Sequence, residues 1–311
     1  MAQPRRQRVS RPVPFVHLAA AAGLLGLIAL GSTDSVLAQE GGTGASVDKW
    51  QYHLFNPTPR DQMRDLAADR PDATESPITV DAGHVQVEMS FIDYTHDDED
   101  GEEVDAWAFA DTNIKVGLLN NVDMQIVFAA YGDERVKVDE TPDAEAFVEN
   151  ETGFSDVQLR FKVNLWGNDP VPGQTTAFGI MPFIKIPTGA GLSNGHAEGG
   201  VIAMFGWDVA ETWGLGFQVE LDAVYDEEDD DTDLEFAHTA VLGFDVVGPL
   251  GAYIEYLGVL PSESASQYQA SFSGGVTLEI TRDLRLDAGL RAGLTDDADD
   301  LVLFTDMTVR F

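Results

Sequence analysis

Runs of about ten residues in which apolar and polar side chains alternate are the feature that most constrains this chain. In the segment SDVQLRFKVNLWG (155–167), Val157 and Leu159 fall on one face, while Gln158 and Arg160 fall on the other. The same pattern recurs in three further segments, GFQVELDAVY (216–225), SFSGGVTLEI (271–280) and LRLDAGLRAGLTD (284–296). A tilted strand needs ~9 to 11 residues to cross a bilayer. These runs therefore predict membrane-spanning β-strands.

Alternation of this kind continues from about Thr79 onward. It predicts about twelve strands. Their expected positions are near 80–94, 104–119, 122–131, 155–166, 175–187, 198–209, 214–225, 234–247, 251–260, 268–281, 284–294 and 301–311. An even number of strands is typical of single-chain bacterial barrels.

The connections between these strands alternate in kind. The odd connections are mostly long or acidic, as in HDDEDGEE (96–103) and DEEDDDTD (226–233), whereas even ones such as NN (120–121) and TRD (281–283) are mostly short. Short turns at one rim and longer loops at the other are typical of outer-membrane barrels. A soluble β-sandwich also shows alternation, but it has no reason to sort its loops in this way. The predicted fold class is therefore all-β, an antiparallel transmembrane β-barrel of about twelve strands.

The last predicted strand, LVLFTDMTVRF (301–311), alternates up to the aromatic Phe311. In a barrel the last strand pairs with the first, here near Thr79–Tyr94, so that no sheet edge is left exposed. Bacterial assembly machinery recognises a terminal aromatic residue of such barrels. We expect Phe311 to act as this assembly signal.

The first 38 residues have the three parts of a secretory signal peptide. Four arginines up to Arg11 precede an apolar run at 16–31, and Val36 and Ala38 supply a small-x-small cleavage site. An uncleaved N-terminal membrane anchor is the alternative. Export and cleavage of residues 1–38 predict localisation in the cell outer membrane.

Residues 39–78 differ from the rest of the chain because they are polar, rich in proline and without sustained alternation. We expect them to form a short irregular N-terminal extension, either a plug in the lumen or a periplasmic segment. The predicted domains are thus a signal peptide at 1–38, this extension at 39–78 and the barrel at 79–311.

Composition excludes several classes of function. A net charge of −36 excludes nucleic acid as a partner, because phosphate binding needs Lys and Arg. The chain has no cysteine, which removes disulfides and thiolate catalysis. Neither G-x-S-x-G nor H-E-x-x-H occurs, and His196 stands alone in a loop segment. We therefore expect neither an enzyme nor a resident cofactor.

Several stretches resemble the family of exported barrel proteins associated with transport or with the MetA pathway of phenol degradation. They are LFNPTPRDQMRDLAADRPDATESPITVDAGHVQVEM (54–89), GFSDVQLRFKVNLWGND (153–169), MPFIKIPTG (181–189), NGHAEGG (194–200) and the terminal strand. The first of these is the most specific. The resemblance implies an outer-membrane barrel that passes small, aromatic or apolar molecules, and it implies no catalytic residues. The unusually acidic loops of this chain depart from the pattern of this family.

Eleven charged residues fall on the polar faces of the predicted strands. A Lys or Arg on the lipid side would cost ~2 to 4 kcal/mol near the bilayer midplane, so we expect these side chains to line the lumen. They are Arg160, Lys162, Lys185, Glu220, Asp222, Glu279, Arg285, Asp287, Arg291, Asp306 and Arg310. They would either line an aqueous path with regions of different charge, or pair across neighbouring strands and fill a narrow barrel.

The acidic runs offer weak candidates for a metal site, because Ca²⁺ and Mg²⁺ prefer carboxylate oxygens. The candidates are Asp97, Asp98, Glu227, Asp229 and Asp230. None of the runs matches the D-x-[DN]-x-[DN]-G calcium loop. A solvated rim of mutually repelling loops is the simpler interpretation, and cations that bridge these loops to lipid phosphates are a third.

Three hypotheses for function follow. The first is an outer-membrane barrel that allows passive or facilitated passage of small molecules. The second is a structural barrel with a closed lumen, whose acidic loops bind divalent cations, lipid or a partner. The third is a soluble periplasmic β-sandwich that binds a ligand. For the barrel, the expected partners are outer-membrane lipid, the barrel-assembly machinery and a small-molecule solute.

Overall fold

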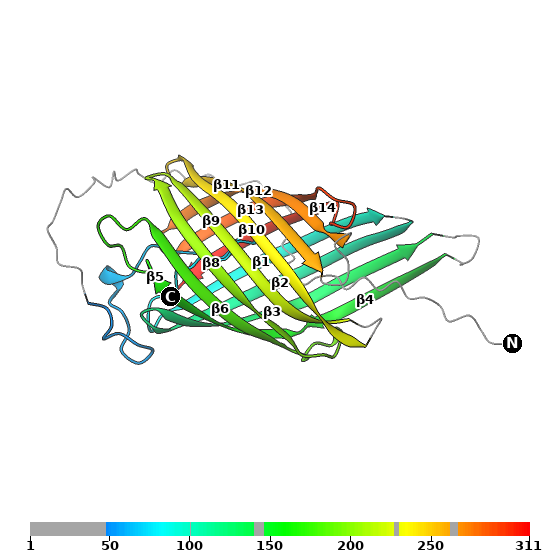
Figure 1. Ribbon diagram of the computed structural model, residues 1–311, viewed down its shortest axis with the longest axis horizontal. Coiled ribbons are helices and arrows are strands. Elements are labelled where there is room, and N and C mark those ends of the chain that lie inside the picture. The colour runs from blue at the N-terminus through cyan, green and yellow to red at the C-terminus, as the bar shows by residue number, and fades with distance from the viewer. Residues whose placement is uncertain (1–47, 100, 140–145, 227–229, 262–266) are drawn as a thin grey trace.

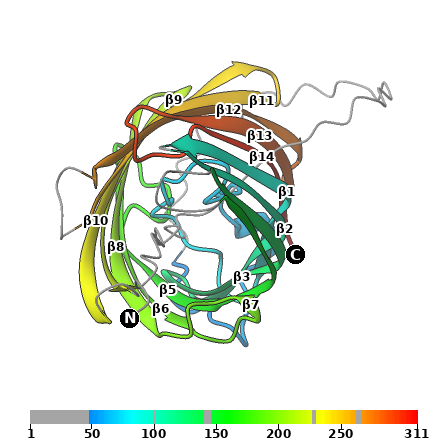
Figure 2. The ribbon, with the colours of Figure 1, turned by 90° about the vertical axis from the view of Figure 1, so that its right-hand side faces the viewer.

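The computed structural model describes residues 48–99, 101–139, 146–226, 230–261 and 267–311. The predicted signal peptide and residues 39–47 lie outside these ranges. The strands are β1 (Val85–Glu99), β2 (Glu102–Leu119), β3 (Val122–Val138), β4 (Phe147–Ser155), β5 (Val157–Trp166), β6 (Thr176–Ile186), β7 (Gly191–Leu192), β8 (Glu198–Ala210), β9 (Trp213–Asp226), β10 (Asp231–Val247), β11 (Leu250–Pro261), β12 (Gln269–Thr281), β13 (Leu284–Gly293) and β14 (Leu301–Arg310). They form one closed barrel (Figures 1 and 2).

Pairing between β1 and β14 closes the barrel. β1 is antiparallel to β2 on one side and to β14 on the other, with Gln86 opposite Arg310 and Val87 opposite Val309. β4 and β5 both pair with β3, one after the other, so they act as a single barrel strand interrupted at Asp156. The two-residue β7 pairs with β4 and is not counted as a barrel strand. The barrel therefore has twelve antiparallel strands, as predicted.

Two predicted loops are largely strand, and these expectations were wrong. The predicted strands leave 132–154 as a long connection, but β3 continues to Val138 and β4 pairs with it. The acidic segment 96–103 belongs mostly to the ends of β1 and β2. In both places the strands extend beyond the apolar region. Both faces of these strand ends carry polar side chains. Alternation therefore ends before the backbone pairing does.

The connections at one rim are mostly short and those at the other are mostly longer, as predicted. One rim, called here the tight-turn rim, carries the connections at 120–121, 167–175, 211–212, 248–249 and 282–283. β1 begins and β14 ends at this rim. The opposite rim carries the extended ends of β1 to β4 (Figure 1).

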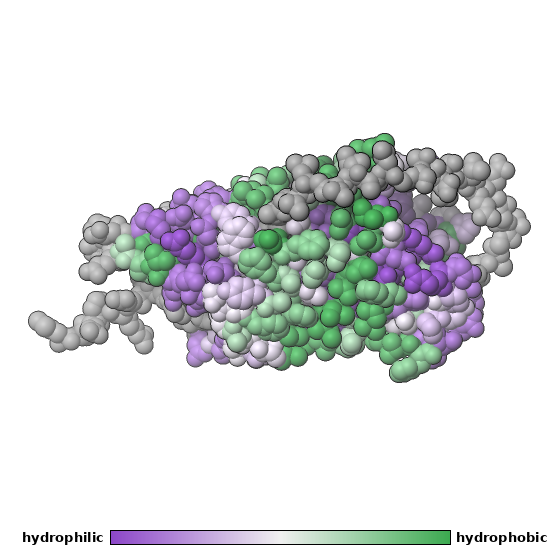
Figure 3. Space-filling model, turned by 180° about the vertical axis from the view of Figure 1, so that it is seen from behind, coloured by the Kyte–Doolittle hydropathy of each residue, from purple (hydrophilic) through white to green (hydrophobic). Residues whose placement is uncertain are grey.

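The outer face of the barrel is an apolar belt. Its exposed side chains include Phe161, Ile184, Val201, Phe217, Val219, Leu221, Phe236, Ile254, Phe272, Val276 and Leu290. Figure 3 shows this green band between hydrophilic ends. Such a surface is stable in hydrocarbon and unfavourable in water. The barrel therefore spans a membrane, and the soluble β-sandwich hypothesis is wrong.

Tryptophans mark the borders of the belt. Trp166, Trp207 and Trp213 lie at or near strand ends on the tight-turn rim, and Trp107 lies toward the opposite rim. All four are exposed, and Trp166 and Trp213 stack on neighbouring aromatic rings at centroid distances of 4.8 and 4.9 Å. Indole rings favour the membrane–water interface. The four tryptophans thus form an aromatic girdle at the borders of the belt.

The chain before β1 enters the barrel from the tight-turn rim. It contains one short 3₁₀ helix, η1 (Arg60–Gln62). Residues 63–79, called here the plug, continue into the lumen, where Figure 2 shows the blue-to-cyan trace inside the ring of strands. No helix among the described residues is long and apolar enough to cross a membrane.

Candidate functional site: the plugged lumen

Asp69 binds two lysines of the lumen wall. The Nζ of Lys162 (β5) lies 2.7 and 2.6 Å from its two carboxylate oxygens, and Lys115 (β2) also donates to it. Lys115 forms a second ion pair with Glu88 of β1, whose carboxylate accepts the Asp69 backbone N–H at 3.1 Å. Burial would raise the pKa of Asp69, but the charges of Lys115 and Lys162 outweigh it and hold the pKa below its usual range. Asp69 is therefore an ionised anchor of the plug.

Arg70 carries the opposite charge and contacts a different part of the wall. Its guanidinium forms ion pairs with Asp111 (β2) and with Asp306 (β14), the latter at 3.2 Å, and donates to the Ser90 hydroxyl at 2.7 Å. Burial lowers the pKa of Arg70, but the two aspartates raise it above its ordinary value. Arg285 of β13 donates to the Arg70 carbonyl oxygen. Two successive plug residues thus each meet a wall of complementary charge.

The tip of the plug hydrogen-bonds to Glu255 of β11. This carboxylate accepts the backbone N–H groups of Ala73 and Thr74 at 3.0 and 2.8 Å and the Thr74 hydroxyl at 2.6 Å. The Thr74 hydroxyl also lies 2.6 Å from that of Thr239 on β10. The Ser273 hydroxyl donates to Glu255 at 3.3 Å. Glu255 therefore acts as a multiple acceptor for the plug backbone.

Glu75 connects the plug to β5 and β9. Its carboxylate lies 2.6 Å from Arg160 and 3.6 Å from Lys162, and its backbone N–H donates to Gln218 at 2.7 Å. Burial and the neighbouring charge of Asp69 raise the pKa of Glu75 to about 8, although Lys162 and Arg160 act in the opposite direction. Glu75 is thus a plug acid that titrates near neutral pH.

The base of the plug is fixed at the tight-turn rim. The Arg64 backbone N–H donates to the Asp81 carboxylate at 2.9 Å, and the Arg64 guanidinium donates to the Asn120 carbonyl oxygen at 3.0 Å. Arg310 of β14 donates to the Arg64 carbonyl at 3.0 Å and pairs with Asp283 at 2.9 Å. These contacts join the plug to both the first and the last part of the barrel.

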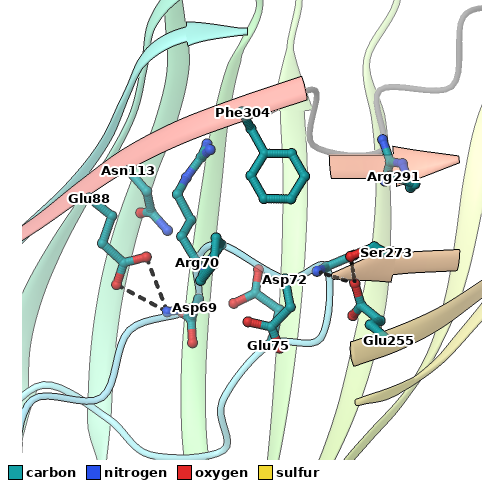
Figure 4. A pocket seen from close by; sticks show the side chains of 12 residues that line it. Asp69, Arg70, Asp72, Glu75, Glu88, Asn113, Glu255, Ser273, Arg291 and Phe304 are labelled. Atoms are coloured by element: carbon teal, nitrogen blue, oxygen red, sulfur yellow. Dashed lines mark hydrogen bonds between the residues drawn. The ribbon is translucent and has the colours of Figure 1, made fainter. Parts of the chain in front are cut away.

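A small cavity remains between the plug and the wall (Figure 4). Its volume is about 20 Å³. It is lined by Asp69, Arg70, Pro71, Asp72, Ala73, Glu75, Glu88, Asn113, Glu255, Ser273, Arg291 and Phe304. A cavity needs ~10 to 15 Å³ to hold one water molecule. This space therefore admits water but no organic solute while the plug keeps this position.

The predicted lumen residues fall into three groups. Arg160, Lys162, Lys185, Asp287, Arg291, Asp306 and Arg310 are buried, Glu220, Asp222 and Arg285 are partly buried, and Glu279 is exposed near the tight-turn rim. Five of them contact the N-terminal chain directly, namely Arg160, Lys162, Arg285, Asp306 and Arg310. Lys185 instead pairs with Glu198 at 2.5 Å. That these side chains line a path for solute stays a prediction.

Sequence reasoning missed some wall residues of this network and all of its plug residues. Lys115, Glu88 and Ser90 occupy polar positions of alternating runs, so the same pattern that indicated Lys162 could have identified them. Asp69 and Arg70 lie in a segment without alternation, where nothing in the sequence indicated which charges would face the wall.

The described part of the chain does not bring the predicted metal-site candidates together. Its residues contain no group of three or more His, Asp or Glu placed to hold a metal ion. Among the weak candidates, Glu227 and Asp229 lie outside the described residues, whereas Asp97, Asp98 and Asp230 lie within them. The His196 ring stacks on Tyr225 at a centroid distance of 3.4 Å. Cation binding by the acidic loops stays a prediction, as does the assembly role of Phe311.

One solved outer membrane channel shares this fold, and other solved outer membrane proteins are similar to a lesser degree. An outer membrane channel from Pseudomonas putida F1 matches with a TM-score of 0.56 and 12% identity over 79% of this chain and 100% of that chain. The NanC porin (TM-score 0.42, 9% identity, 73% and 97% coverage) and the CymD monoaromatic hydrocarbon channel (0.40, 10%, 73% and 88%) match more loosely. At these identities the likeness concerns the fold alone. No curated protein sequence matches this chain.

The membrane-spanning barrel, with its apolar belt and sorted connections, places the chain in the outer membrane. The family described as "Putative MetA-pathway of phenol degradation" matches residues 68–311, which include most of the plug and the whole barrel. The predicted resemblance is therefore confirmed, and the chain belongs to this family.

Proposed function

We propose that this protein is an outer-membrane channel for small solutes and that the plug controls passage through its lumen. The observation that carries the proposal is that charged and polar contacts, rather than a packed apolar core, hold the plug in the lumen. Buried ion pairs contribute little net stability, because desolvation offsets most of their attraction. Water and solute can therefore replace these contacts at lower cost than they could replace a dry core.

Passage requires the plug to move. The cavity beside Asp72 and Glu255 holds about 20 Å³, which accommodates a water molecule. Displacement of residues 69–75 would expose Lys115, Lys162 and Asp306 to the lumen and open a charged aqueous path. Diffusion along this path needs no source of energy and no catalytic group.

The solute class that we propose is small polar or amphipathic molecules, phenol-like compounds among them. The charged wall favours molecules that can hydrogen-bond, and the family description names a pathway of phenol degradation. The wall offers both signs of charge, with Lys115 and Lys162 on one part and Asp306 on another, so neutral molecules of this class are the first solutes to test.

A closed structural barrel is the second candidate. The density of plug contacts favours it, since Asp69, Arg70, Thr74 and Glu75 each bind the wall through side chains. The two candidates differ in one measurable property, which is the permeability of the lumen.

Conductance and solute flux separate the candidates. The full chain would be inserted into planar bilayers and into liposomes loaded for swelling with phenol or with a small sugar. Wild type is expected to show low permeability, and Asp69→Asn, which removes the charge that binds Lys115 and Lys162, a higher one. Arg60→Met is the matched control, because Arg60 is exposed outside the lumen. A variant that inserts and folds but stays as impermeable as wild type would favour the structural barrel.

The export route is also a proposal. We infer cleavage after Ala38 from the basic, apolar and small-residue parts of the first 38 residues. Mass spectrometry of protein purified from outer membranes tests it. A mature N-terminus at Gln39 is expected, and a chain that retains its first residues would indicate an uncleaved anchor.

A further inference from the structure

Three apolar side chains project from the chain just before the plug. Trp50 is 71% exposed and Phe55 is 87% exposed, and Leu54 is exposed beside them. They lie on residues 48–56, called here the rim loop, which occupies the same end of the barrel as the last residue of β14 (Figure 1). Exposed apolar side chains that lie together, and not scattered singly, mark a surface that binds something apolar.

Backbone hydrogen bonds set the shape of the rim loop. His53 and Asn56 exchange N–H···O bonds at 3.0 and 2.8 Å, which forms a tight turn with Leu54 and Phe55 at its tip. The Tyr52 N–H donates to the Lys49 carbonyl at 3.0 Å and forms a second turn around Trp50. The apolar residues are therefore at the tips of ordered turns.

The rim loop is attached to the barrel rim. The Leu54 N–H donates to the Leu118 carbonyl at 2.8 Å, and His53 forms a bridge with Leu119. Lys49 is buried and pairs with Asp169 in the turn between β5 and β6 at 2.8 Å. The loop is thus held against two neighbouring turns of the tight-turn rim.

The apolar surface of the rim loop continues the lipid-facing surface of the barrel. Leu119, directly beside His53, is exposed at the end of β2. Trp166 is exposed at the end of β5, three residues before the Asp169 that binds Lys49. Both belong to the border of the apolar belt, where Trp and other large side chains meet the headgroup region.

We propose that the rim loop inserts Trp50, Leu54 and Phe55 into the interfacial region of the inner leaflet of the outer membrane. The inner leaflet is the one beside the tight-turn rim, because outer-membrane barrels have their short turns on the periplasmic side. The occupant of this surface is phospholipid at the depth of the headgroups and the first acyl carbons. The rim loop anchors one end of the plug in the membrane, and β1 anchors the other. A plug held at both ends cannot leave the barrel as a unit, so opening has to occur by rearrangement of residues 63–79. The anchoring itself does not depend on conduction.

Site-directed labelling tests the proposal, because the chain has no cysteine of its own. The full-length protein carrying Phe55→Cys or Trp50→Cys would be labelled with bimane and reconstituted in phosphatidylcholine vesicles. Phe217→Cys in the belt is the lipid-exposed control, and Asp231→Cys at the opposite rim is the water-exposed control. Emission would be compared with shallow nitroxide lipids and with aqueous iodide as quenchers.

Labels at positions 55 and 50 are expected to lose emission to the nitroxide lipids as Phe217→Cys does and to resist iodide. Quenching by iodide alone, as at Asp231→Cys, would overturn the proposal. Protection from iodide that arises only after a periplasmic extract is added would also overturn it and indicate a protein partner. As a label-free check, Trp50→Ser with Phe55→Ser is expected to increase tryptic cleavage at Arg60 in vesicles, while heat-modifiable migration on gels verifies folding. Unchanged cleavage would count against membrane anchoring.

Discussion

The two sides of the lumen wall hold the plug in different ways. Toward β1, β2, β5 and β14, charged side chains of Asp69 and Arg70 meet charges of opposite sign. Toward β9, β10 and β11, the wall mainly accepts hydrogen bonds from the plug backbone and from Thr74. The contacts on the first side require particular charged side chains on the plug. The contacts on the second side require mainly that the plug backbone keeps its position.

This difference ranks the contacts by what their loss should do. Removal of one partner of a buried ion pair leaves an uncompensated charge and costs ~3 to 5 kcal/mol. Loss of a hydrogen bond to a buried acceptor costs ~1 to 3 kcal/mol. The charged side should therefore control plug position more strongly than the accepting side.

Arg70→Met should have the largest effect. It leaves the buried Asp111 and Asp306 without their cation, so the free energy of unfolding should fall by about 3 to 5 kcal/mol and the plug should leave its position. Urea unfolding in detergent and single-channel conductance would measure both changes. Arg60→Met removes an exposed ion pair and should cost about 0 to 1 kcal/mol. Equal effects of the two variants would contradict the ranking.

The pair of Asp69 and Lys162 should come next. In a double-mutant cycle of Asp69→Asn and Lys162→Met, the joint loss of stability should be smaller than the sum of the single losses by ~0.5 to 3 kcal/mol. Each substitution removes one of the charged partners of the other residue, so the second change loses an interaction that the first has already removed. Strict additivity would show that the plug does not occupy the lumen as described.

Thr74→Val should have a smaller effect. It removes the hydroxyl that donates to Glu255 but keeps the backbone N–H bonds to the same carboxylate, so a loss of about 1 to 3 kcal/mol is expected. Thr74→Ser retains the hydroxyl and should behave as wild type. A loss as large as that of Arg70→Met would remove the distinction between the two sides.

Glu75 should also give a pH dependence, and the sign of this dependence follows from its raised pKa. Its pKa is raised from 4.5 to about 8, so the folded protein binds more protons than the unfolded chain between these values. Stability therefore falls as pH rises through this window, and conductance should rise modestly. Glu75→Gln should remove this component of the pH profile. An identical slope in wild type and Glu75→Gln would show that another group titrates.

The barrel could be predicted from sequence because membrane strands must alternate, and the apolar side chains of β5, β9 and β12 do so over their membrane-facing length. The extended pairing of β3 with β4 could not, since residues such as Glu134 and Lys137 lie beyond the lipid, where no apolar face is required. The sequence predicted a plug only as one of two alternatives for residues 39–78, the other being a periplasmic segment. Its contacts join Arg70 to Asp306 across 236 positions, and local patterning carries no signal for such pairs.

A reversible lock on the plug tests the central claim most directly. The Thr74 and Thr239 hydroxyl oxygens lie 2.6 Å apart, and the chain has no cysteine, so Thr74→Cys with Thr239→Cys offers a site for a single disulfide. In the Arg70→Met background, the account predicts low conductance when this pair is oxidised and high conductance after reduction. The single-cysteine variants should conduct equally in both conditions. Equal, high conductance of the verified disulfide form and its reduced form would contradict control of passage by the plug.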